Sequence, residues 1–122
     1  MLEGVLIAES LRVGAQLTGI PLRITRLTRV EMTNRGEEQP RLWTLLDFAA
    51  EELEAQRLAD QLASCLSSTG GWYADFHTSH DTFVIFADKV FRYPRGEAEG
   101  RREARDYGRS VGVPEQQLDW RE

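Results

Sequence analysis

Residues 70–96, GGWYADFHTSHDTFVIFADKVFRYPRG, decide the fold. Aromatic and β-branched residues alternate with polar ones along this stretch, and turn-forming residues interrupt it near residues 79–81 and at Asp88 and Lys89. Such alternation between turn signals is typical of consecutive antiparallel strands. We therefore predict a three-stranded meander that ends at Pro94 and Gly96.

The residues before the meander predict further strands. Residues 22–32, LRITRLTRVEM, alternate with period 2 and then shift phase, which indicates a strand with a bulge or bend. Residues 41–48, RLWTLLDF, predict a strand paired with it across the polar loop 33–40. Residues 5–8 predict a short strand near the start of the chain.

Two helices are expected, at residues 51–66 and 97–111. The first has an apolar stripe at helical spacing, formed by Ala55, Leu58, Ala59, Leu62 and Leu66. The second contains Gly100 and Gly108 and is followed by the stop signal of Gly112 and Pro114. Because a glycine inside a helix costs roughly 1 kcal/mol relative to alanine, these glycines predict close packing against a sheet.

The order of strands, helix, three strands and helix favours an α+β fold. We predict a two-layer sandwich with a largely antiparallel sheet of about five strands and both helices on one face. A chain of 122 residues with 41% apolar content supports one core, so residues 1–122 are expected to form a single domain.

Composition narrows the classes of function. A net charge of −5 with 29% charged residues argues against nucleic acid as a partner. No run of about eighteen apolar residues occurs, and the first residues lack the pattern of a secretory signal, so no membrane association is expected. The single cysteine, Cys65, cannot form an internal disulfide and is expected to be a packed thiol near a helix end. These features predict a cytoplasmic protein.

Three blocks of sequence carry a resemblance to other proteins. GGWYADF at 70–76, VFRYPRG at 90–96 and GVPEQQLDW at 112–120 resemble a family of small uncharacterised bacterial α+β proteins. The similarity extends over nearly the whole chain and implies one complete domain. The family has no established activity, so the resemblance implies no catalytic residues.

One candidate site lies on the first strand of the meander. Period 2 places Tyr73, Asp75 and His77 on one face of this strand. A carboxylate beside a histidine can orient the imidazole as a general base, although on an exposed sheet such a pair is more often a solvated cross-strand contact. Neighbouring strands can add Asp47 and either Tyr93 or Arg92, as ligand-binding candidates.

A second candidate is the turn HTSHD, in which His77, His80 and Asp81 are possible metal ligands. The chain has only two histidines, and the turn offers no rigid frame. Local hydrogen bonds of turn residues explain the same sequence. We therefore expect no metal, and no motif for another cofactor occurs.

Two functions remain open. The first is a non-enzymatic binding or interaction domain, whose partly covered, aromatic-rich sheet associates with another protein or with a second copy in a homodimer. The alternative is a small hydrolase or isomerase that uses Asp75 and His77 as acid and base, with Arg92 or Tyr93 positioning an anionic substrate. A concave pocket enclosing His77 would favour the enzyme, whereas a flat sheet face would favour the binding domain.

Overall fold

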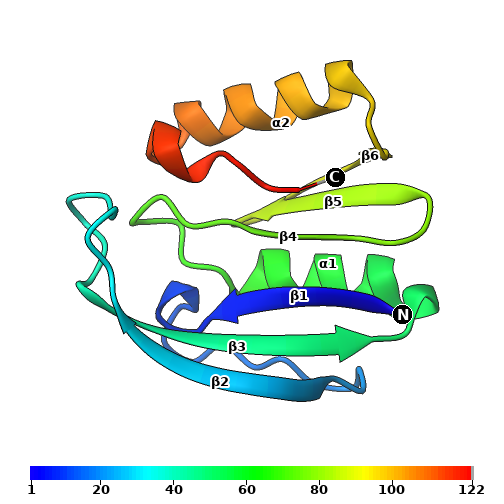
Figure 1. The fold of residues 1–122 in the computed structure, drawn as a ribbon, viewed down its shortest axis with the longest axis horizontal. Coiled ribbons are helices and arrows are strands. Elements are labelled where there is room, and N and C mark those ends of the chain that lie inside the picture. The colour runs from blue at the N-terminus through cyan, green and yellow to red at the C-terminus, as the bar shows by residue number, and fades with distance from the viewer. Residues whose placement is uncertain (122) are drawn as a thin grey trace.

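The computed structural model describes residues 1–121 and contains a six-stranded, entirely antiparallel sheet (Figure 1). The strand order is β2-β3-β1-β4-β5-β6. The strands are β1 (Leu2–Ile7), β2 (Arg23–Glu31), β3 (Leu42–Ala50), β4 (Ala74–His77), β5 (Asp81–Phe86) and β6 (Lys89–Pro94). The helices are α1 (Ala55–Cys65) and α2 (Ala98–Ser110), and short 3-10 turns occupy Ala8–Ser10, Glu52–Glu54 and Glu115–Gln117.

The predicted α+β fold with an antiparallel sheet is confirmed. The meander forms β4, β5 and β6, and the hairpin forms β2 and β3 with a register shift between Ile24 and Arg26. The sheet has six strands instead of about five, because β1 is a full strand of six residues in the interior of the sheet, between β3 and β4.

The two helices pack on opposite faces of the sheet, so the expectation of both on one face was wrong. Strand β5 shows why: Phe83 and Ile85 belong to the core under α1, whereas Val84 and Phe86 belong to a second cluster with Ala104 of α2. A strand that is apolar at four successive positions needs cover on both faces. We call these two sides of the sheet the α1 face and the α2 face.

The C-terminal segment 111–121 belongs to the α2 face. It returns from the end of α2 and runs between that helix and the sheet (Figure 1). Leu118 and Trp120 are buried there, and Trp120 Nε1 donates a hydrogen bond to the Tyr93 hydroxyl at 2.8 Å. The segment therefore covers part of the sheet face.

Cover on the α2 face is incomplete. Among the strands, only β5 and β6 contribute side chains to the cluster under α2, and Tyr73, directly before β4, packs against it. Strands β1, β2 and β3 lie away from α2 in Figure 1, so the helix does not cover this half of the sheet. We call this uncovered area the open half-face, and Val5 near its centre is 45% exposed.

Candidate functional site

A hollow of about 300 Å³ lies where the open half-face meets the C-terminal segment. Its apolar floor is formed by Val5, Ile7 and Leu45, and Trp43 and Trp72 line it as well. The two tryptophan rings meet edge to face with their centroids 5.2 Å apart. Pockets that bind small molecules combine this kind of apolar and aromatic lining with a few polar groups.

The sheet register brings the lining residues together. In antiparallel sheets, directly opposite residues point to the same face. Strand β1 pairs Val5 with Asp47 of β3, and the pairing of Gly4 with Phe76 sets Val5 beside Asp75 of β4. The same registers align Ile7 with Leu45 and Tyr73. Three strands distant in sequence thus supply two parallel rows of side chains.

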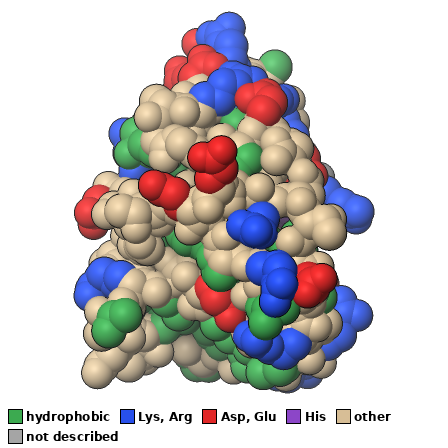
Figure 2. Space-filling view, turned by 90° about the vertical axis from the view of Figure 1, so that its left-hand side faces the viewer, with side chains coloured by type: hydrophobic (Ala, Val, Ile, Leu, Met, Phe, Trp, Pro, Cys, Tyr) green, Lys and Arg blue, Asp and Glu red, His purple; other side chains and the backbone are tan. Residues whose placement is uncertain are grey.

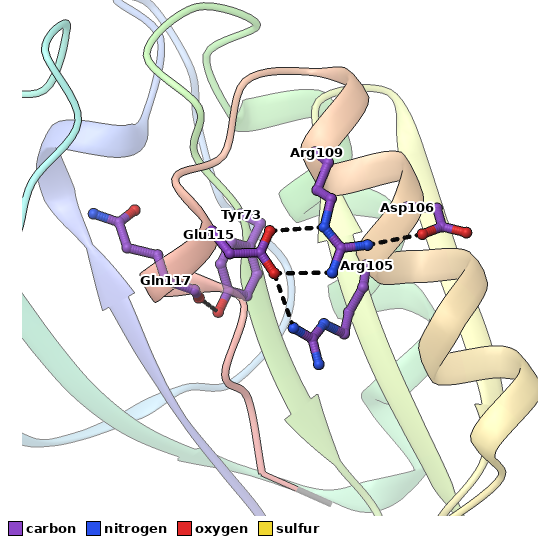
Figure 3. Close-up of polar contacts among 6 residues, drawn as sticks. All are labelled: Tyr73, Arg105, Asp106, Arg109, Glu115 and Gln117. Atoms are coloured by element: carbon purple, nitrogen blue, oxygen red, sulfur yellow. Dashed lines mark hydrogen bonds and ion pairs between the residues drawn. The ribbon is translucent and has the colours of Figure 1, made fainter.

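The opposite wall of the hollow is the C-terminal segment, which contributes Gln116, Gln117 and Asp119. An ion-pair cluster anchors this segment to α2 (Figure 3). Glu115 accepts hydrogen bonds from Arg109 at 2.7 and 2.9 Å and from Arg105 at 3.2 Å. The hydrogen bonds from Arg109 lower the pKa of Glu115 to about 2, so this carboxylate is charged in any ordinary buffer.

Tyr73, directly before β4, connects the same segment to the sheet by a hydrogen bond. Its hydroxyl donates a hydrogen bond to the carbonyl oxygen of Gln117 (Figure 3). Burial raises the pKa of Tyr73, and the carboxylates of Asp75 and Asp119 raise it further, while Arg101 opposes them. Tyr73 is therefore a neutral hydrogen-bond donor whose proton is already engaged.

Gln39 and Gln117 form a hydrogen-bonded pair of glutamines, of which Gln117 lines the hollow. Gln39 is only 2% exposed, and its side chain accepts a hydrogen bond from Gln117 Nε2 at 2.8 Å and donates one to the Gly71 carbonyl at 3.3 Å. Gln117 Nε2 also donates to the Asn34 carbonyl at 3.0 Å. Sequence reasoning missed this network, although the glutamines in both GEEQP and PEQQLDW were visible signals.

Most sequence-predicted site residues share the α2 face but do not form one cluster. Asp47 forms an ion pair with Arg26 at 3.2 Å on the open half-face. Tyr73 and Asp75 line the hollow. Tyr93 is only 5% exposed and accepts the hydrogen bond from Trp120 beneath α2.

Arg92 lies on the other side of the sheet, on the α1 face. It forms an ion pair with Asp81 at 2.7 Å, and its guanidinium lies 5.0 Å from the centroid of the Phe83 ring. Because adjacent residues of a strand alternate between faces, the burial of Tyr93 under α2 directs Arg92 away from the hollow.

His77 lines a separate hollow of about 270 Å³, together with Glu52, Ser79 and Arg95. Its Nδ1 lies 3.3 Å from the carbonyl oxygen of Thr78. Glu52 accepts hydrogen bonds from the Ser79 amide at 3.0 Å and from its hydroxyl at 2.9 Å, and these bonds lower the pKa of Glu52. Asp75 and His77 thus face different hollows, a geometry that does not assemble an acid and a base around one substrate.

The HTSHD turn is held by hydrogen bonds to a threonine. Thr78 Oγ1 accepts the amide of His80 at 3.3 Å and the amide of Asp81 at 3.1 Å, while the Asp81 carboxylate pairs with Arg92. Residues 1–121 contain no group of three or more His, Cys, Asp or Glu side chains that could hold a metal ion. Cys65 is buried, and its Sγ lies 3.4 Å from the Gln16 carbonyl.

The surface at the end of the molecule that carries loops 33–41 and 66–73 has mixed charge. Figure 2 shows acidic, basic and hydrophobic side chains interspersed there, without a large surface patch of only positive or only negative charge. In the described part of the chain, no helix has the length and apolar character that crossing a membrane requires.

Comparisons with models of protein families, with curated proteins and with solved structures gave no match. The resemblance of the GGWYADF, VFRYPRG and GVPEQQLDW blocks to small bacterial proteins stays a prediction.

Proposed function

We propose that this chain is a non-enzymatic binding domain of the cytoplasm, and that it binds another protein, in the first place a second copy of itself, through the open half-face. The observation that carries the proposal is the incomplete cover of the α2 face, which leaves Val5 45% exposed near the middle of the sheet. His77 does line a hollow, but Asp75 lines a different one, and this separation favours binding over acid–base catalysis by the pair.

The interacting surface is aliphatic and not aromatic. Trp43, Trp72, Phe83 and Tyr93 are all at most 7% exposed, so the aromatic residues serve mainly the core. Val5, Ile7 and Leu45 remain at the surface of the open half-face, flanked by the ion pair of Asp47 and Arg26. An apolar centre with a charged rim is the usual composition of a protein interface.

A face-to-face dimer fits better than pairing of sheet edges. The outer strand β2 carries Arg23, Arg26 and Arg29 and has a bulge between Ile24 and Arg26. Charged side chains and bulges on an edge strand oppose the addition of another strand. A two-fold axis through the open half-face instead lets the same patch serve both partners.

Sedimentation equilibrium at micromolar concentration tests the proposal. We expect the unchanged protein to sediment as a dimer and Val5→Asp to sediment as a monomer, because two carboxylates would then meet at the two-fold axis. Val13→Asp is the matched control, since Val13 is fully exposed in the loop between β1 and β2. A monomeric unchanged protein, or a Val5→Asp variant that still dimerises, would contradict the face-to-face dimer.

A further inference from the structure

We infer that the hollow beside His77 is a binding site for a small zwitterion, a free α-amino acid. Its lining includes the carboxylates of Glu3 and Glu52, the imidazole of His77 and the guanidinium of Arg95. This hollow shares no lining residue with the one that contains Val5, although Glu3 borders the open half-face. The inference therefore goes beyond the proposed association.

Two opposite charges in this hollow are available to a ligand. Glu3 and Arg95 are both exposed, and within residues 1–121 neither the Glu3 carboxylate nor the Arg95 guanidinium forms an ion pair. Arg95 Nη1 donates one long hydrogen bond, of 3.5 Å, to the Thr78 carbonyl oxygen. Because the two charges line one hollow without pairing with each other, a molecule that carries both charges can bridge them.

The sheet register places His77 beside Glu3. The pairing of Gly4 with Phe76 sets Glu3 of β1 directly opposite His77 of β4, on the α2 face. His77 Nδ1 lies 3.3 Å from the Thr78 carbonyl oxygen, which can only accept, so a hydrogen bond there requires the proton on Nδ1. Nε2 of the neutral ring is then an acceptor. Glu3 and His77 thus offer two acceptors to the ammonium group of a ligand.

The second carboxylate of the hollow, that of Glu52, is already engaged. Its Oε1 accepts both hydrogen bonds from Ser79, and its Oε2 lies 3.7 Å from the amino group of Met1. Glu52 therefore does not pair with Arg95, whose guanidinium can bind a carboxylate through two parallel hydrogen bonds. The ligand carboxylate is assigned to Arg95, and its ammonium group to Glu3 and His77.

The size of the hollow limits the ligand to one residue. Its volume of about 270 Å³ is slightly below the range of pockets for drug-sized molecules, which begins at about 300 Å³. A free amino acid carries both charges on a single residue and fits this limit. A peptide carries its two terminal charges on different residues, and the dipeptide alanylalanine separates the two cases.

Backbone amide signals of residues 77–80 in a ¹⁵N-labelled sample provide the readout. We expect L-alanine to shift these signals saturably in the millimolar range and to leave the indole signal of Trp43, in the other hollow, in place. Alaninamide lacks the carboxylate and N-acetylalanine lacks the ammonium group. Each should bind about fivefold more weakly than L-alanine, because each loses one partly screened ion pair.

Charge removal supplies the matched variants. Glu3→Gln should weaken L-alanine binding about three- to fivefold and leave N-acetylalanine binding unchanged, since that ligand has no ammonium group for Glu3. Arg95→Gln should weaken L-alanine binding by the same factor and leave alaninamide binding unchanged. Arg102→Gln and Glu103→Gln remove the same charges from the exposed surface of α2 and should have no effect.

Three results would overturn the inference: no saturable shift, equal binding of L-alanine and both blocked derivatives, or tighter binding of alanylalanine than of L-alanine. The dimer proposal is tested separately. Val5→Asp should abolish association while retaining L-alanine binding, and Arg95→Gln should weaken L-alanine binding while retaining association.

Discussion

Replacing Gly100 by alanine tests how closely α2 packs on the sheet. A Cβ atom at this position would lie 2.5 Å from both Cβ and Cγ of Tyr93 in β6. The Tyr93 Cβ is fixed by its own backbone, so the clash is relieved only if α2 or β6 moves. Such movement would also disturb the buried hydrogen bond from Trp120 to the Tyr93 hydroxyl.

Two opposing effects set the magnitude. Alanine favours a helix over glycine by roughly 0.5 to 1 kcal/mol. Overpacking of a well-filled core costs typically about 1 to 3 kcal/mol. Because a separation of 2.5 Å is far below van der Waals contact and the obstructing atoms are rigid, the cost should exceed the gain. We expect Gly100→Ala to lower the free energy of unfolding by about 1 to 2 kcal/mol.

Urea unfolding followed by tryptophan fluorescence measures this effect, and the midpoint should fall by about 1 M. Gly108→Ala is the control on the same helix. Its Cβ would lie 2.7 Å from Leu118 Cδ2, the end of a flexible side chain, and no closer than 3.4 Å to the Phe86 ring. Its stability should change much less. A Gly100→Ala variant as stable as the unchanged protein would refute the reasoning.

Two further predictions follow from single groups. The pKa of Glu115 is about 2 instead of its ordinary 4.5, so the stability that Glu115 contributes is present above about pH 4.5 and is lost as the pH falls toward 2. In Glu115→Gln, the free energy of unfolding should therefore depend less steeply on pH over this range, which acid unfolding followed by far-ultraviolet circular dichroism measures. Cys65, which is 2% exposed, should react with an aromatic disulfide reagent only as fast as the protein opens, and rapid labelling of the folded protein would contradict its packed position.

The sequence predicted the elements better than their faces. The alternation of apolar and polar residues, together with the turn residues, predicted the ends of the meander strands to within a few residues. The apolar stripe that includes Leu58 and Leu62 identified α1. The first strand was expected to be short because Glu3 and Gly4 interrupt its apolar run. In the structure, Gly4 lets the Phe48 ring approach, since a Cβ there would lie 2.7 Å from Phe48 Cζ.

The opposite placement of the helices had a visible signal that the prediction did not use. Residues Phe83 to Phe86 are all apolar, whereas a strand with one solvated face alternates. Had this run been interpreted as a strand buried on both faces, α2 would have been predicted on the face opposite α1. It would also have placed Tyr93 under the helix and Arg92 with Asp81, and removed Arg92 from the candidate site.

The hollow itself could not be predicted from local pattern, because it is assembled by register and by a returning C-terminal segment. Val5 and Asp75 meet only through the pairing of Gly4 with Phe76, and Asp119 arrives through the clip of Glu115 with Arg105 and Arg109. Arg105 and Arg109 lie on α2 and Glu115 begins the following 3-10 turn, and because none of the three lines the hollow, they set the position of its wall without touching a ligand. A ligand that contacts Asp119 therefore binds more tightly when Glu115 holds segment 111–121 against α2 than when these ion pairs are broken. By linkage, such a ligand stabilises the packing of α2 on the sheet.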